Sequence, residues 1–247
     1  MTTGFIAALL VGALAGGFIN GLAGFGTALL SLGVWLQILP PQQAVSVVVV
    51  MSVISGLQGV WIVRDHIQDN PRRLARFLLP ALIGVPLGLM LLSSISTFAL
   101  KLTIAAFMIL YGGFFTLRRS LPRFSRPTPL TDSVVGFLGG VLGGAASLSG
   151  ALPTMWCAMR PWTKGETRAV LQPFNVVVLG LTMSLLAWQG NYDRETLILI
   201  LLALPATMIG AQLGIRVFHH LDDNGFRRLL IGLLFASGIL ICLRELI

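Results

Sequence analysis

A few polar side chains interrupt long apolar stretches of this sequence, at two places that correspond to each other at a shift of 123 residues. Asn20 and Thr27 lie inside the apolar run 4–36, and Ser147 and Ser149 lie inside a similar run further along the chain. Their amide and hydroxyl groups donate hydrogen bonds. This is the chemistry that binds an anion without a metal, provided that the fold brings these groups together.

The first apolar run, residues 4–36, has an unusual length of 33 residues. A membrane span needs ~20 apolar residues, so the run is too long for one span and too short for two. Gly21, Gly24 and Gly26 loosen any helix in its middle. Because broken backbone at membrane depth survives only where it is buried or lines a cavity, we predict a hairpin with a break at 20–26.

A hairpin that breaks inside the membrane exposes the start of its second arm. A helix start offers free N–H groups and the positive end of a dipole, which suits an anion. Two hairpins entering from opposite faces would bring two such starts together near the midplane. The predicted substrate-binding residues of the two hairpins are Asn20, Gly21, Gly24, Phe25, Gly26, Thr27, Ser147, Ser149 and Gly150. For any single one of them, the alternative is that small residues only permit close helix packing.

Two amide side chains, Gln172 and Asn175, form the most polar point of a later apolar segment. They are three residues apart and therefore share a face of a helix. They could line the path of a substrate beside the second hairpin, or they could satisfy backbone groups that Pro173 leaves free. Both interpretations remain open at this point.

The composition requires a membrane. The chain has 247 residues, of which 55% are hydrophobic and 11% are charged, with a mean hydropathy of +0.88, whereas about 25% of a soluble domain is charged. Two cysteines exclude a disulfide framework. The N-terminus lacks the basic region of a cleaved signal peptide, so the first apolar segment is expected in the mature protein.

The sequence predicts an all-α polytopic membrane protein of two inverted repeats. At a shift of 123 residues, Gly16 and Gly17 fall on Gly139 and Gly140. Each repeat is expected to consist of a re-entrant or broken glycine-rich hairpin followed by three transmembrane helices. The expected repeats are 1–120 and 132–247, joined by a cytoplasmic linker at 121–131. The expected segments are the broken segment 4–36 with spans 44–63, 77–92 and 98–117, then the broken segment 133–159 with spans 169–189, 196–217 and 229–243.

The basic residues give the topology. If both broken segments crossed the membrane, 10 Lys and Arg would lie on one side and 7 on the other; if both turn back, the division becomes 14 against 3. The second arrangement fits the positive-inside rule, which also explains the net charge of +8 without nucleic acid. We therefore expect six full spans in the cell inner membrane, with both termini outside.

Two copies of a glycine-rich motif carry a resemblance to a known family. The first copy is 12–30, with AGG at 15–17 and GFGT at 24–27; the second is 136–153, with SLSGALP at 147–153. Both are similar to the pattern GxxAGxxxxxxGxGGGxxxxP that opens each half of the sulfite exporter TauE/SafE family. The chain resembles this family over essentially its whole length.

The chain also departs from the family pattern. Thr27 stands where a triple glycine would continue, Ser147 and Ser149 replace glycines, and the first copy has Leu30 where the second has Pro153. The resemblance implies a transporter of small sulfur-containing or organic anions, such as sulfite or an organosulfonate. We expect this protein to export such an anion.

No Asp or Glu lies inside a predicted apolar segment. Because proton-driven pumps usually need an intramembrane carboxylate, we expect the membrane potential to drive transport. The alternatives are a carrier or channel for another small solute and, less well supported, an intramembrane enzyme that uses Ser149. All three histidines lie in predicted loops, so we expect no enzyme. Expected partners are a small anionic substrate and the lipid bilayer, with a homodimer left open, and no nucleic acid, cofactor or metal.

Overall fold

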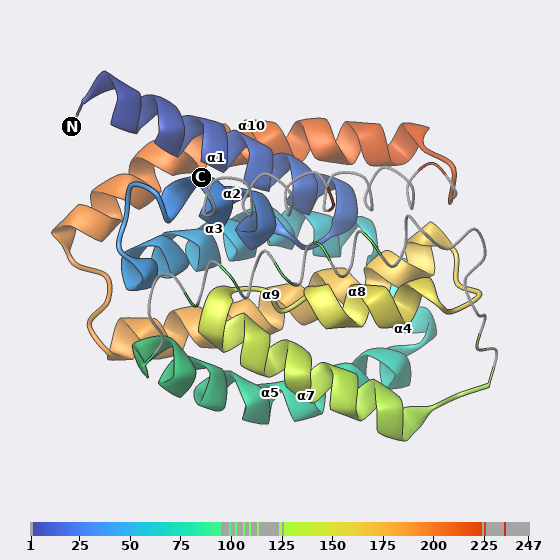
Figure 1. The fold of residues 1–247 in the computed structure, drawn as a ribbon. Helices are drawn as coiled ribbons and strands as arrows, with labels where there is room; N and C mark the ends of the chain where they lie inside the picture. Colours follow the sequence, from blue (N-terminus) through green and yellow to red (C-terminus); the bar gives the residue numbers. More distant parts are fainter. Residues whose placement is uncertain are drawn as a thin grey trace.

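The fold is a bundle of helices that lie roughly parallel to one another (Figure 1). The computed structural model describes residues 2–94 and 126–223, together with the single residues 99, 102, 106, 109, 113, 124, 225 and 235. Most of the expected spans 98–117 and 229–243, and positions 121–123 and 125 of the expected linker, lie outside the described residues. Every regular element in the described part is a helix, which confirms the predicted all-α class.

The described helices alternate between long and short. They are α1 (Thr3–Ala23), α2 (Thr27–Trp35), α3 (Pro41–Ile62), α4 (Arg64–Asp69), α5 (Pro71–Ser94), α7 (Pro129–Ala146), α8 (Ala151–Ala158), α9 (Lys164–Trp188) and α10 (Arg194–His220). Six helices of the described part, α1, α3, α5, α7, α9 and α10, are long and apolar enough to cross a membrane. Since α1 and α7 belong to the broken segments, these are not the same six segments that the sequence predicted as full spans.

Both broken segments fold as hairpins. In the first, Ser31 of α2 donates a hydrogen bond to the backbone oxygen of Gly12 in α1 (2.8 Å), and Trp35 Nε1 donates to the oxygen of Leu9 (3.1 Å). α2 therefore runs back along α1. In the second hairpin α8 runs back along α7 in the same manner, and α1 and α7 enter the bundle from opposite ends (Figure 1). The inverted duplication and the division into two repeats stay predictions.

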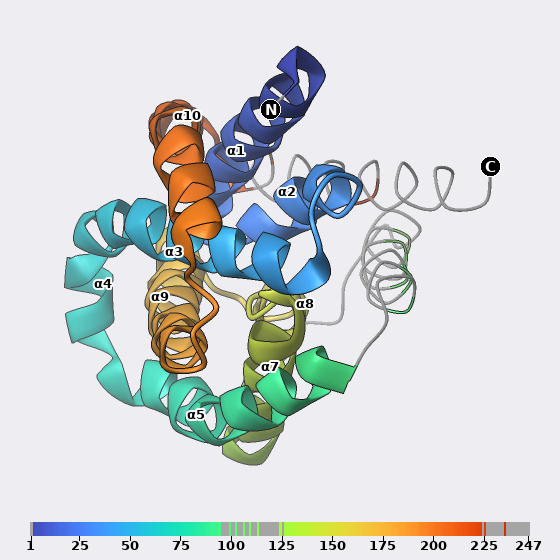
Figure 2. The ribbon, with the colours of Figure 1, turned by 90° about the vertical axis from the view of Figure 1, so that its left-hand side faces the viewer.

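Glycines hold the long arm of each hairpin against a helix of the other predicted repeat. α1 packs along α10, and α5 packs along α7 (Figure 2). A Cβ added to Gly21 would lie 2.7 Å from the carbonyl carbon of Ala211, and one added to Gly140 would lie 2.7 Å from Cα of Ala81. The backbones thus touch directly, as small residues allow in membrane helices.

The polar stretches 64–76, 160–168 and 219–228, which the predicted segments leave between them as loops, are partly helical. The polar stretch 64–76 contains α4 and the start of α5, and α10 includes His219–His220. The expected loop 160–168 ends early, because α9 begins with a capping box in which Thr163 and Glu166 bond to each other's backbone. The physical reason is common to all three: a helix does not end where its sequence becomes polar, because polar first and last turns are satisfied by caps and water.

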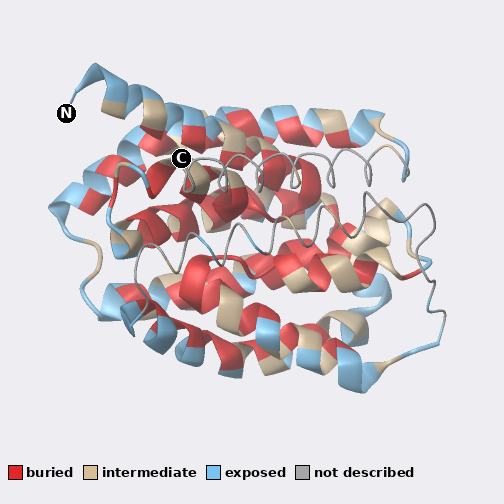
Figure 3. Cartoon of the chain, in the orientation of Figure 1, coloured by how far each residue is buried: buried red, intermediate tan, exposed pale blue. Residues whose placement is uncertain are grey.

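Apolar residues occupy both the inside and the outside of the bundle. Buried residues gather on the helix faces turned toward its middle (Figure 3). The outer faces carry large apolar side chains such as Trp61, Ile83 and Met90, which are 68–70% exposed. A soluble protein rarely exposes such patches, so this surface supports the multi-pass membrane assignment.

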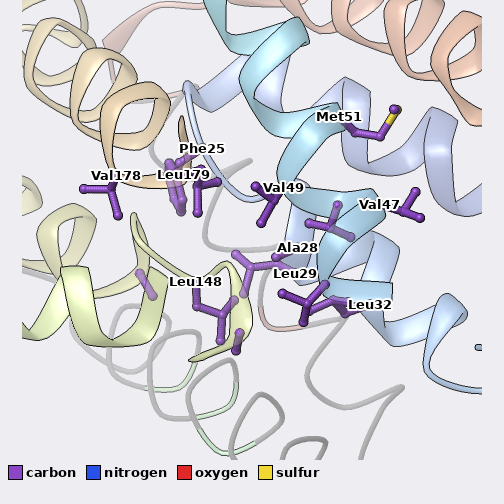
Figure 4. Packing of buried hydrophobic residues seen from close by; sticks show 14 of the residues in the cluster. Phe25, Ala28, Leu29, Leu32, Val47, Val49, Met51, Leu148, Val178 and Leu179 are labelled. Atoms are coloured by element: carbon purple, nitrogen blue, oxygen red, sulfur yellow. The ribbon is translucent and has the colours of Figure 1, made fainter. Parts of the chain in front are cut away.

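The apolar core lies between the two hairpin tips and the helices around them. Phe25 from the first tip and Leu148 from the second lie near Val178 and Leu179 of α9 and Val49 of α3 (Figure 4). All five are at most 2% exposed. The tips of both broken segments are therefore fixed inside the protein.

Candidate functional site

The first hairpin tip requires its glycines. Gly24 and Gly26 have φ values of 85° and 95°, a left-handed region that glycine adopts without steric cost. The N–H of Gly24 donates to the oxygen of Asn20 (2.8 Å) and so closes the end of α1. The chain then reverses, and α2 starts at Thr27 with the free N–H groups that any helix start presents.

The second tip has the same plan but uses serine. Ser147 has a φ of 57° and is the only described residue other than glycine with positive φ. Its N–H donates to the oxygen of Gly143 (2.9 Å), which is the bond of the αL helix-end motif, and the N–H of Leu148 donates to the oxygen of Leu142 (3.1 Å). Its buried hydroxyl has no partner. A positive φ at a residue other than glycine costs about 1–3 kcal/mol, and glycine would avoid this cost. Backbone strain that is kept in this way is typical of a functional position.

The two tips touch each other. A Cβ added to Gly150 would lie 2.5 Å from Cγ of Phe25 and 2.6 Å from its Cβ. Phe25 is 1% exposed, so its ring fills the space that a side chain at position 150 would occupy. The structure thus brings these two predicted site residues together, although they are far apart in the sequence.

Asn20 connects the first hairpin to α3. Its Nδ2 donates to Ser55 Oγ (2.6 Å) and to the backbone oxygen of Ser52 (3.1 Å). The side chain is 1% exposed, and its Oδ1 has no hydrogen-bond partner. Asn20 therefore has a structural contact on one side and an unused acceptor on the other.

The two amides of α9 face different tips. Gln172 Nε2 donates to the oxygen of Gly56 (3.0 Å), and its Oε1 accepts from Arg168 Nε (3.2 Å). Asn175 Oδ1 accepts from Ser149 Oγ (2.6 Å), whereas its Nδ2 has no partner. Neither amide bonds to the backbone of α9, so the alternative that they replace bonds freed by the proline of this helix finds no support.

Arg168 is a site candidate that the sequence analysis missed, because it was counted among the loop charges. Its side chain is 0% exposed. Nη2 donates to the oxygen of Gly21 (2.8 Å), and the guanidinium lies 4.3 Å from the ring centre of Phe218. The pattern T-x-x-E at Thr163–Glu166 marks a helix start and would have placed Arg168 inside α9.

Buried polar atoms without a partner concentrate around the tips. In the described part of the chain they are Asn20 Oδ1, Thr27 Oγ1, Ser147 Oγ, Thr154 Oγ1, Arg160 Nε, Arg168 Nη1 and Asn175 Nδ2. Six of the seven belong to the hairpins or to α9, and all but one can donate a hydrogen bond. Since buried polar atoms without partners are rare in folded proteins, this arrangement suits a ligand that accepts several hydrogen bonds.

A buried carboxylate, Asp132, lies in the first turn of α7, just before the predicted segment. It is 4% exposed and accepts from Arg160 Nη2 (3.1 Å) and Trp156 Nε1 (2.7 Å). Arg160 also donates to the backbone oxygens of Phe124 and Arg126. The charge of this carboxylate is thus compensated, and the pair fixes α8 and the preceding chain to the start of α7.

The fold and the site together define a class. Apolar helices that enclose two broken hairpins, with buried hydrogen-bond donors at the point where the tips meet, are the architecture of a membrane transport protein. The chain matches the family Sulfite exporter TauE/SafE over residues 8–241, and it belongs to this family. The comparison with curated proteins found no match, and neither did the comparison with solved structures.

The family assignment confirms the resemblance carried by the two glycine-rich motifs. It makes the protein a multi-pass membrane transporter of the sulfite or sulfonate type, and a transporter family implies that the chain is not an enzyme. The membrane in which the protein resides, the side on which its termini lie and the residues that touch the substrate stay predictions.

Proposed function

We propose that this protein exports a small sulfur-containing anion, sulfite or an organosulfonate, and that the anion binds where the two hairpin tips meet. One observation carries the proposal: the unpartnered buried donors gather at these tips, in a chain that belongs to a family of sulfite exporters.

The donor set matches the chemistry of such an anion. Sulfite and sulfonates present three oxygens on one sulfur, and each oxygen accepts hydrogen bonds. Thr27, Ser147 and Asn175 each have an unused donor, and the start of α2 adds partial positive charge. A helix end contributes typically ~0.3–1 kcal/mol, and up to ~2 kcal/mol when partly buried. Binding of this strength lets a carrier release its substrate.

The direction follows from the charge of the substrate. A potential that is negative inside drives an anion outward by roughly 2.3 kcal/mol per charge per 100 mV. Asp132, the buried carboxylate of the described part, is already paired with Arg160, which argues against a proton-coupling role. Basic loops on the cytoplasmic side would concentrate anions there. We therefore expect electrogenic efflux that needs no coupling ion.

Reconstituted vesicles test this mechanism directly. The purified protein is placed in liposomes, and the flux of sulfite and of methanesulfonate is measured with voltage and pH gradient set separately. The expected flux follows the voltage and persists when only the pH gradient is collapsed. A flux that depends strictly on the pH gradient at clamped voltage would show proton coupling. Flux of uncharged solutes with none of sulfite or sulfonate would favour a carrier or channel for another small solute.

A single hydroxyl tests the location of the site. Thr27 Oγ1 is buried without a partner, so Thr27→Val should raise the free energy of unfolding by about 1 kcal/mol. If the hydroxyl binds the anion, the same variant should raise the apparent KM for sulfite. Thr182→Val is the matched control, because Thr182 Oγ1 donates to the oxygen of Val178 (2.9 Å). The Thr182→Val variant should lose about 1 kcal/mol of the free energy of unfolding and keep the wild-type KM. A wild-type KM in Thr27→Val would remove Thr27 from the site.

A further inference from the structure

We propose that Arg168 is the counter-charge for the transported anion and binds it at the first hairpin tip, an inference that rests on the proposed function. The partial charges and hydroxyl groups described above can recognise the shape of an oxyanion. Arg168 adds a full positive charge, so the site would select for negative charge as well as for hydrogen-bond acceptors.

The first argument is the absence of a protein counter-ion. Arg168 is 0% exposed, and none of the described residues forms an ion pair with it. The other deeply buried arginine, Arg160, has its carboxylate partner Asp132 at 3.1 Å. A buried charge is strongly unfavourable without a partner. An anion that comes from outside the chain would supply the missing charge.

The second argument is the way in which the guanidinium is held. Gln172 fixes Nε, the oxygen of Gly21 fixes Nη2, and the ring of Phe218 covers one face. Nη1 has no hydrogen-bond partner although it carries two N–H donors. The side chain is thus oriented by contacts that leave one end available to a ligand.

The third argument is location. A Cβ added to Gly24 would lie 3.3 Å from Cγ of Arg168 and 2.8 Å from Oε1 of Gln172. Position 24 is therefore kept free of a side chain by the arginine and its partner, as well as by its positive φ. The charge stands directly at the tip of the first hairpin, beside the turn that leads to Thr27 and the start of α2.

A purely structural role is the competing explanation. Gly21 lies in the last turn of α1, where carbonyl oxygens lack partners within the helix and the dipole favours a cation. Arg168 could serve only as a cap for α1. This explanation accounts for the bond from Nη2, but not for the unpartnered Nη1. If Arg168 only caps α1, replacing it should lower the stability by the same amount with and without the anion.

The test compares three purified variants in sulfite flux and in the rise of the melting temperature that added sulfite causes. Arg168→Gln keeps a donor for Gly21 and removes the charge. Arg168→Lys keeps the charge and loses the planar fork. Arg216→Gln removes an exposed charge from α10 as the control. We expect Arg168→Gln to raise the KM for sulfite about ten- to a hundredfold and to abolish the sulfite-induced shift. Arg168→Lys should give an intermediate KM, and Arg216→Gln should match wild type.

The outcomes separate the two proposals. A wild-type KM and a wild-type sulfite shift in Arg168→Gln, even with lowered basal stability, would leave Arg168 as a cap of α1 only and overturn the inference. If Arg168→Gln does not fold, the melting shift of the wild type is compared for methanesulfonate and its uncharged analogue dimethyl sulfone, and an equal shift with both overturns the inference. If the wild type moves no sulfite or sulfonate, the proposed function fails. The melting shift is then measured with formate, phosphate and chloride. If one of these anions raises the melting temperature of the wild type but not that of Arg168→Gln, the inference is supported. If none of them raises the melting temperature of the wild type, the inference is overturned.

Discussion

Replacing Gly21 by alanine tests the backbone contact that holds the first hairpin against α10. The added Cβ would lie 2.7 Å from the carbonyl carbon of Ala211 and 2.8 Å from its Cα, whereas ordinary contact begins at 3.4 Å. Both neighbours are backbone atoms, so neither can rotate away. The two helices would have to separate by roughly 1 Å, which close-packed interiors resist.

The expected loss of stability follows from two opposing effects. Overpacking costs typically about 1–3 kcal/mol, and the upper end applies because the obstacle is backbone. Alanine also favours a helix over glycine by about 1 kcal/mol. Gly17, one turn earlier, makes the same kind of contact, with Thr207, and it would be pulled away as well. We therefore expect Gly21→Ala to lower the free energy of unfolding by about 2 kcal/mol.

Gly180→Ala is the matched control. Gly180 lies within α9, and nothing lies within 4 Å of the position that its Cβ would take. This variant should be as stable as the wild type or more stable by up to about 1 kcal/mol. Both variants are measured by unfolding in mixtures of mild and denaturing detergent. Equal stability of Gly21→Ala and Gly180→Ala would refute the close contact between α1 and α10.

Three further predictions concern the second hairpin, the buried ion pair and the topology. Ser147→Gly should stabilise the protein by about 1 kcal/mol, because glycine adopts the positive φ without strain. The same variant should slow sulfite flux, and faster or unchanged flux would exclude the Ser147 hydroxyl from the site. Asp132→Asn should destabilise the protein by about 3 kcal/mol, since it leaves Arg160 buried without its carboxylate. Adding Arg160→Met to this variant should recover part of the loss, and additive losses would mean that the pair is not coupled. In intact cells, Glu195→Cys should react with an impermeant thiol reagent and Pro161→Cys should not, and the reverse result would invert the topology.

The glycine-rich tips show how much of the site could be predicted from the sequence. Gly24 and Gly26 interrupt an apolar run, and the structure uses both in the left-handed region that favours glycine. Asn20 and Ser147 were identified as polar groups inside apolar segments, and both have a buried atom without a partner. These features are readable because they depend on the residue itself and on its neighbours in the chain.

Arg168 shows what the sequence left undecided. It looked like a loop charge because it follows a polar stretch, and only the fold shows that it is buried against Gly21, 147 residues away in the chain. The sequence likewise put Gln172 and Asn175 on one helix face, but it could not tell that one bonds to Gly56 of α3 and the other to Ser149 of the second tip.

Composition and hydropathy by themselves determined that this chain is a helical membrane protein with two broken segments, because the length and polarity of each segment decide whether it suits a bilayer. The tertiary structure alone decided which helices meet. α1 packs on α10 and α5 packs on α7, so each hairpin is held by a helix of the other predicted repeat. Such pairings depend on where small residues let two backbones approach. Because each contact joins two surfaces that are far apart in the sequence, no local sequence pattern encodes their fit.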